Sequence, residues 1–230
     1  MTEWSTVHSR TPRAGSLEPA AALVVALLLA SLRPALAQEA PLPPAPAANE
    51  RGTAARFLSG AAVAFAIHEA GHIVAGLALD ARPRAQRIDY GMIPFFAIHH
   101  RPVPPRQEFV ISSAGFWAQH AGSEWLLSAH PNLRRERSPL LKGMLAFNLA
   151  TSAVYAVAAI GKLGPPERDT RGIAISLGQD GASEPAVGLL ILGPALLDGY
   201  RYLRPEQQWA KWTSRGLKIA GVALVIAAAR

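Results

Sequence analysis

The sequence contains no cysteine and is poor in charged residues. Charged side chains make up 17% of the 230 residues and hydrophobic ones 50%, whereas a soluble domain usually carries about 25% charged residues. The absence of cysteine excludes disulfides, thiolate metal ligands and a cysteine nucleophile. The high apolar content excludes a disordered chain, which would be poor in such residues. The composition therefore favours a membrane protein.

The formal net charge of +7 does not by itself indicate a nucleic-acid partner. The basic residues form short clusters between apolar runs and have few aromatic residues among them. That distribution is more typical of topology signals and lipid-headgroup contacts than of a nucleic-acid interface. We therefore expect the lipid bilayer, and no nucleic acid, among the partners.

The first 56 residues show the pattern of a secretion signal followed by a linker. Arg10 and Arg13 precede an apolar core at Ala20–Leu32, and Ala35–Ala37 provides a small-residue cleavage site. The residues that follow are rich in proline and alanine, as extended linkers are. We predict a signal peptide or signal anchor, a linker and a membrane-embedded domain, at residues 1–37, 38–56 and 57–230.

Apolar segments of helical length follow the linker. Residues 57–79 are long enough, at about 1.5 Å per residue, to cross a hydrocarbon core of about 30 Å. Their only titratable groups are His68, Glu69 and His72. Further apolar segments lie at residues 109–129, 140–160, 185–197 and 217–229. The expected fold class is an all-α membrane protein with about four to five transmembrane helices in the mature chain.

The stretch Ile88–Ile98 differs from its helical neighbours. It has the β-branched and aromatic content of a strand, interrupted by Gly91 and Pro94. We therefore expect a short β-hairpin or re-entrant loop after the first helix. Such a hairpin could pair with an extended peptide through its backbone, or it could be an ordinary connection.

The sequence from His68 to His72 (HEAGH) is an HExxH motif. On a helix, residues i and i+4 share one face, so both imidazoles can reach one metal ion. Glu69 can instead reach a metal-bound water and act as general base. A charge at membrane depth costs about 2.5–3.5 kcal/mol, so three titratable groups in one apolar helix need a shared partner. We predict Zn²⁺, with His68 and His72 as ligands.

A zinc site of this kind needs a third protein ligand from elsewhere in the chain. Asp198 is the favoured candidate, because Leu197-Asp198-Gly199 closes an apolar segment and places a carboxylate near membrane depth. Glu124 is the competitor, since it shares a helical face with His120 at i, i+4. For Glu124 itself we favour a place in a polar patch that lines the bundle interior.

The HExxH motif in a membrane helix, followed far downstream by Leu197–Gly199, resembles the site-2 protease family (peptidase family M50). Members of that family are intramembrane zinc metalloproteases that cleave membrane-spanning substrates. Ser113–Gln119 occupies the place of the family segment Ala-Gly-Pro-x-x-Asn, with Phe116 and Gln119 at the proline and asparagine positions. The resemblance extends from Phe57 to Arg204. It implies that His68, His72 and Asp198 bind zinc. It also implies that Glu69 is the catalytic acid/base.

Two functions from different classes follow as expectations. The first is an intramembrane zinc-dependent endopeptidase that hydrolyses membrane-spanning protein or peptide substrates, with Glu69 activating a zinc-bound water. The second is a non-catalytic zinc-binding membrane protein that binds a partner transmembrane helix. The substitutions at Phe116 and Gln119 favour the second, and the presence of Glu69 favours the first. We expect an integral protein of the bacterial inner (cytoplasmic) membrane, while the sequence does not determine the oligomeric state.

Overall fold

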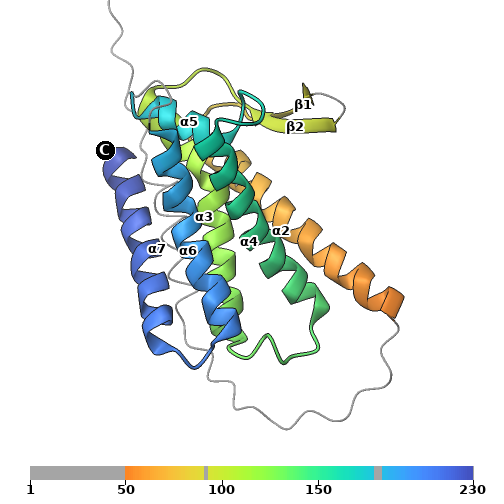
Figure 1. Ribbon diagram of the computed structural model, residues 1–230. Helices are drawn as coiled ribbons and strands as arrows, with labels where there is room; N and C mark the ends of the chain where they lie inside the picture. The colour runs from red at the N-terminus through yellow and green to blue at the C-terminus, as the bar shows by residue number, and fades with distance from the viewer. Residues whose placement is uncertain (1–49, 91–92, 179–182, 230) are drawn as a thin grey trace, which may run out of the picture.

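The structure is a computed structural model that describes residues 50–90, 93–178 and 183–229 (Figure 1). The predicted signal and most of the predicted linker lie outside these residues. The described residues form six helices and a two-stranded antiparallel hairpin after the first of them, which confirms a mostly helical fold with a hairpin in the expected place. The elements are α2 Glu50–Ala78, β1 Arg84–Tyr90, β2 Ile93–His99, α3 Pro105–Ala129, α4 Pro139–Gly161, α5 Asp169–Ser176, α6 Glu184–Leu203 and α7 Gln208–Ala229.

Among the described residues, three helices are long and apolar enough to cross a membrane, namely Arg51–Ala78, Pro139–Gly161 and Glu184–Leu203. Their outer faces expose large apolar side chains to an extent that a water-soluble domain would not tolerate. Leu77, Val154 and Leu196 are 64%, 65% and 64% exposed. These helices are consistent with an integral membrane protein.

Helix α3 lies in the middle of the bundle and packs against every other helix (Figure 1). It corresponds to the span predicted at residues 109–129 and is buried around most of its circumference. Neither α3 nor α7 is among the three apolar helices, and both carry charged side chains. Glu124 of α3 and Lys218 of α7 point into the bundle, where they form a buried ion pair.

Glycine allows α2 and α4 to approach each other closely. A Cβ atom on Gly60 would overlap the backbone carbonyl of Leu140, and one on Gly143 would overlap that of Phe57. Small residues at such contacts are common between membrane helices, since they let two backbones touch. The close approach brings the α2 face that carries the HExxH motif next to α4.

Two elements differ from the sequence prediction at residues 162–203. The stretch between the apolar segments at residues 140–160 and 185–197 contains α5, and the second of these segments continues as α6 to Leu203. Helix α4 ends where Lys162 adopts a left-handed conformation (φ 52°) and Gly164 follows with φ 92°. The chain then turns back, so that α5 covers the same end of the bundle as the hairpin (Figure 1).

The hairpin is fastened to the end of α2 at its base. Its strands pair from Arg84 opposite His99 to Tyr90 opposite Ile93. The backbone amide of Arg101 donates to the carbonyl of Ala81 at 2.9 Å. The Arg101 guanidinium also donates to the Asp80 carboxylate at 2.8 Å. This fastening holds β2 beside the helix that carries the histidines.

Candidate metal centre

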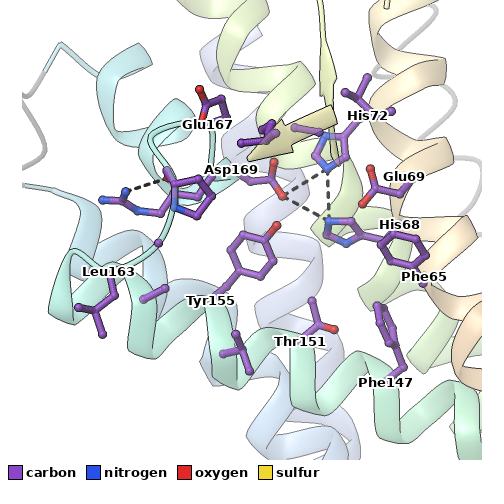
Figure 2. A pocket seen from close by; sticks show the side chains of 18 residues that line it. Phe65, His68, Glu69, His72, Phe147, Thr151, Tyr155, Leu163, Glu167 and Asp169 are labelled. Atoms are coloured by element: carbon purple, nitrogen blue, oxygen red, sulfur yellow. Dashed lines mark hydrogen bonds and ion pairs between the residues drawn. The ribbon is translucent and has the colours of Figure 1, made fainter. Parts of the chain in front are cut away.

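The two histidines of the HExxH motif meet a carboxylate that the sequence prediction did not include. His68 and His72 lie one turn apart on α2 and are 2% and 5% exposed. Asp169, the first residue of α5, faces both of them (Figure 2). Its Oδ2 atom is 3.3 Å from the Nε2 atom of His68 and 3.4 Å from that of His72. The two Nε2 atoms are themselves 3.3 Å apart.

This nearly equilateral triangle has the dimensions of one face of a zinc tetrahedron. Zinc binds imidazole nitrogen and carboxylate oxygen at about 2.0–2.2 Å. Tetrahedral angles then place two ligand atoms about 3.3–3.5 Å apart, which matches the three measured separations. Among the described residues, no further histidine or acidic side chain joins these three, so one vertex is left for water or substrate. The group could therefore hold a metal ion, and its donors suit several divalent ions.

Hydrogen bonds on the far side of each imidazole fix the direction of its lone pair. The Nδ1 atom of His72 donates to the backbone carbonyl of Ile111 at 2.8 Å, because a carbonyl can only accept. The Nδ1 atom of His68 lies 3.0 Å from Oε1 of Gln119. With a metal ion bound and the proton on Nδ1, the Nε2 lone pairs of both rings would be free to bind the ion beside Asp169. Metal-binding histidines are oriented in the same way.

Gln119 can only accept from His68, because its amide nitrogen is already used. That nitrogen donates to the backbone carbonyl of Asn148 and to the Ser152 hydroxyl, both on α4. The side-chain amide of Asn148 donates in return to the backbone carbonyl of Gln119 at 3.2 Å and to the Ser123 hydroxyl at 2.9 Å. Gln119 therefore positions His68. The sequence indicated Gln119 only as a departure from the asparagine of the resembling family.

Two residues beside Asp169 anchor it to the start of α6. Arg168 donates to both carboxylate oxygens of Glu184, at 2.6 and 2.8 Å. Thr170 donates to the same carboxylate at 2.9 Å. Glu184 is 1% exposed. Its carboxylate therefore holds Arg168 and Thr170, the residues on either side of Asp169, in place. Burial raises the pKa of Asp169, but the charges and hydrogen bonds of the two histidines outweigh it and hold that pKa below its usual value.

Gly115 provides the space beside the ligand atoms. A Cβ atom at this position would overlap Nε2 of His72 and would lie 2.6 Å from Nε2 of His68. Gly71, within the HExxH motif, packs on the same part of α3, since a Cβ atom there would lie 2.7 Å from the Ala114 carbonyl. The α2–α3 contact thus depends on small residues at the point where a metal ion would fit.

Glu69 lies beside the imidazoles and outside the ligand triangle. Its carboxylate is on the side of the histidines away from Asp169 (Figure 2). It lines a cavity of about 400 Å³ that opens onto the ligands. This is the position expected of a proton acceptor for a water at the free vertex, rather than of a fourth ligand.

The cavity beside Glu69 is bounded by α2, α4 and the hairpin. Apart from the polar residues of the centre, its walls are mainly apolar, and they include Phe65, Phe147 and Leu163 (Figure 2). A second cavity of about 490 Å³ lies on the other side of His72 and Asp169. Ala97 and Ile98 of β2 border both cavities. The centre is thus reached from two sides, with β2 running past it.

The structure does not bring Asp198, the predicted third ligand, to the histidines; the residue that joins them is Asp169. Asp198 lies within α6, fourteen residues after Glu184, which corresponds to about 21 Å along a helix. Its Oδ1 atom accepts hydrogen bonds from Lys218 and Ser214, each at 2.8 Å, and from Arg201 at 3.3 Å. The Oδ1 atom of Asp198 is thus paired with cations of the bundle interior, while Asp169 faces the histidines.

Glu124, the alternative third ligand, belongs to the same interior cluster. It accepts from Arg201 at 3.2 Å, from Arg215 at 2.8 Å and from Lys218 at 3.0 Å. The interpretation of Glu124 as part of a polar patch inside the bundle is therefore confirmed. The cluster joins α3, α6 and α7, at a separate level of the bundle from the candidate metal centre.

Comparison with protein-family models, with curated proteins and with solved structures finds no match for this chain. The resemblance to the site-2 protease family therefore stays a prediction. What the structure adds is a buried His-His-Asp group, with Glu69 beside it, inside a bundle that contains three helices able to cross a membrane.

Proposed function

We propose that this protein is a zinc-dependent endopeptidase embedded in the membrane, which hydrolyses peptide bonds of membrane-spanning proteins or peptides. His68, His72 and Asp169 would hold the zinc ion, and Glu69 would act as general base. The observation that carries this proposal is the ligand triangle, with sides of 3.3, 3.3 and 3.4 Å and one free vertex. A purely structural zinc site has four protein ligands instead.

Zinc would supply Lewis acidity, which lowers the pKa of water and polarises a carbonyl group. The residues of the chain supply the proton transfers. Glu69 takes a proton from the attacking water while the water oxygen forms a bond to the carbonyl carbon of the substrate. When the C–N bond breaks, Glu69 returns that proton to the leaving amine, so that the carboxylate is regenerated.

The surroundings of the centre suit a peptide that comes from the bilayer. The cavity beside Glu69 has largely apolar walls from α2 and α4. An apolar peptide segment that leaves the bilayer can therefore enter it while its side chains stay away from water. Hydrolysis needs an extended backbone, and β2 offers backbone groups for pairing at the border of the cavity. We further propose that α3 and α7 also cross the membrane, with their charges enclosed by the bundle, which would give five spans.

The second expected function, a non-catalytic zinc protein that binds a partner helix, loses one of its supports. The substitution of glutamine for asparagine at position 119 favoured it. Gln119 now has a role in the metal centre, because it accepts the Nδ1 proton of His68 at 3.0 Å. The presence of Glu69 beside the free vertex favours the enzyme.

Zinc content and cleavage, measured on the same detergent-solubilised protein, test the proposal. The substrate is a fluorogenic peptide with one transmembrane helix. We compare wild type with Glu69→Gln and Asp169→Ala, and use Glu167→Gln as control, because Glu167 is exposed and lines the same cavity. We expect one zinc per chain in all but Asp169→Ala, and cleavage only by wild type and Glu167→Gln. Undiminished zinc in Asp169→Ala would refute the centre. Bound zinc without cleavage of a panel of such peptides would favour the binding protein.

A further inference from the structure

Tyr155 is a polar residue at the metal centre that the ligand set and the general base leave without a role. It lies on α4 and lines the same cavity as Glu69. Its hydroxyl points toward the Asp169 carboxylate (Figure 2). Tyr155 is thus the side chain through which α4 reaches the ligand triangle.

Aromatic contacts hold the Tyr155 ring in place. It stacks on the His68 imidazole, with ring centroids 6.1 Å apart and an interplanar angle of 30°. It also meets Phe116 edge to face, with centroids 4.9 Å apart. Both neighbours are 2% exposed, so neither can move away without opening the core. The hydroxyl therefore occupies a defined position without any ordering cost at the moment of reaction.

That position is suited to contact with the oxygen of a reacting carbonyl. Tyr155 and Glu69 lie on opposite sides of the ligand triangle in Figure 2. The free vertex of a zinc tetrahedron lies about 3.3–3.5 Å from Oδ2 of Asp169. The Tyr155 hydroxyl is directed at Asp169 and lines the same cavity as the two histidines, so it faces the part of the cavity where an oxygen at or next to the free vertex would lie.

We propose that Tyr155 is a catalytic residue that donates a hydrogen bond to the oxyanion of the tetrahedral intermediate. This inference rests on the proposed peptidase function. As the water oxygen bonds to the carbonyl carbon, the π electron pair moves onto the carbonyl oxygen, and the Tyr155 hydroxyl turns from Asp169 to that oxygen. Tyr155 keeps its proton. When the C=O bond forms again, the C–N bond breaks and the amine receives the proton from Glu69.

The variant Tyr155→Phe tests this role because it removes the hydroxyl and keeps the ring that packs on His68 and Phe116. The control is Tyr200→Phe, since Tyr200 is 38% exposed and packs at a tilt against Trp209 at the surface. We measure kcat and KM on a fluorogenic transmembrane peptide and zinc affinity by competition with a chelator. We also measure the affinities of two inhibitors, a peptide phosphonamidate that carries a tetrahedral anion and a peptide thiol that carries none.

We expect Tyr155→Phe to lower kcat by about 10²–10³-fold, the effect of removing one oxyanion donor, with KM little changed. The phosphonamidate should bind at least about tenfold more weakly, since it mimics the oxyanion. Zinc and thiol affinities should stay at the wild-type level, and Tyr200→Phe should match wild type throughout.

Two results would overturn the role of Tyr155 while leaving the proposed function intact. Unchanged phosphonamidate affinity would show that the hydroxyl does not contact the oxyanion. A parallel fall in zinc and thiol affinities would make Tyr155 a positioning residue for Asp169. If the wild type bound neither zinc nor the phosphonamidate, the peptidase function itself would be wrong and this inference would fall with it.

Discussion

Replacing Gln119 with leucine removes the acceptor of the His68 Nδ1 proton while keeping a side chain of similar size. The imidazole then loses the 3.0 Å hydrogen bond that directs its Nε2 lone pair toward Asp169. Loss of such a partner weakens metal affinity about 10–100-fold, which corresponds to about 1.4–2.7 kcal/mol. The metal-free protein also loses stability, by about 1–3 kcal/mol, because the buried N–H is left without an acceptor.

These two effects can be separated by measuring unfolding with and without zinc. At zinc concentrations far above the dissociation constant, the metal stabilises the native state in proportion to the logarithm of its affinity. The free energy of unfolding of Gln119→Leu should therefore be below that of wild type in both conditions, and the deficit should be about 1.4–2.7 kcal/mol larger with zinc than without it. Unfolding by denaturant in mixed micelles, followed by circular dichroism, gives these free energies, and chelator competition gives the affinity directly.

Ser123→Ala is the matched control for Gln119→Leu. Ser123 accepts a hydrogen bond from Asn148 at 2.9 Å in the same polar network, but within the described part of the chain it makes no hydrogen bond to a histidine. We expect it to lower stability without changing zinc affinity. Zinc affinity within twofold of wild type in Gln119→Leu would refute the orienting role, and so would an equal loss of affinity in Ser123→Ala.

Three more predictions concern space, anchoring and pH. Gly115→Ala should abolish zinc binding with helix content retained, since its Cβ would overlap the ligand nitrogens; one zinc per chain in this variant would contradict the geometry. Glu184→Gln should weaken zinc binding about 10–100-fold, because Asp169 loses its anchor; affinity within twofold of wild type would show that the anchor is dispensable. A hydrogen bond to Glu108 raises the pKa of His100, against the opposing effect of burial. The pair should therefore stabilise the fold fully below the unfolded histidine pKa of about 6.5 and progressively less as pH rises through the higher folded value. Denaturation from pH 6 to 9 should show that loss in wild type but not in Glu108→Gln, and equal slopes would exclude the pair as its cause.

The parts of the fold that the sequence predicted depend on local patterns. Hydropathy located α2 and α4 to within a few residues at most ends, and β-branched residues located the hairpin at Ile88–Ile98. The HExxH spacing places two imidazoles on one helical face whatever surrounds them. His68 and His72 were predictable for that reason, since their relation is fixed within one turn of α2.

The third member of the His-His-Asp group could not be predicted in the same way because its position depends on a long-range contact. Asp169 begins a helix of eight residues within a segment of mixed charge, and only the chain reversal after α4 brings it to α2. Asp198 was preferred because a carboxylate in an apolar helix needs a compensating charge. A metal ion can supply that charge, and so can a basic side chain. Arg201, three residues later on the same face, was the local sign of the second explanation.

The charge cluster between α3, α6 and α7 has a consequence for the assembly of the protein in the bilayer. Arg215 and Lys218 both lie on α7 and pair with Glu124 of α3. Inserting two such charges on a lone helix would cost about 5–7 kcal/mol on the translocon scale. If α7 crosses the membrane, as proposed above, these two charges oppose its insertion as a separate helix. It would then enter together with its acidic partners, so that insertion of α7 and closure of the bundle would be a single event.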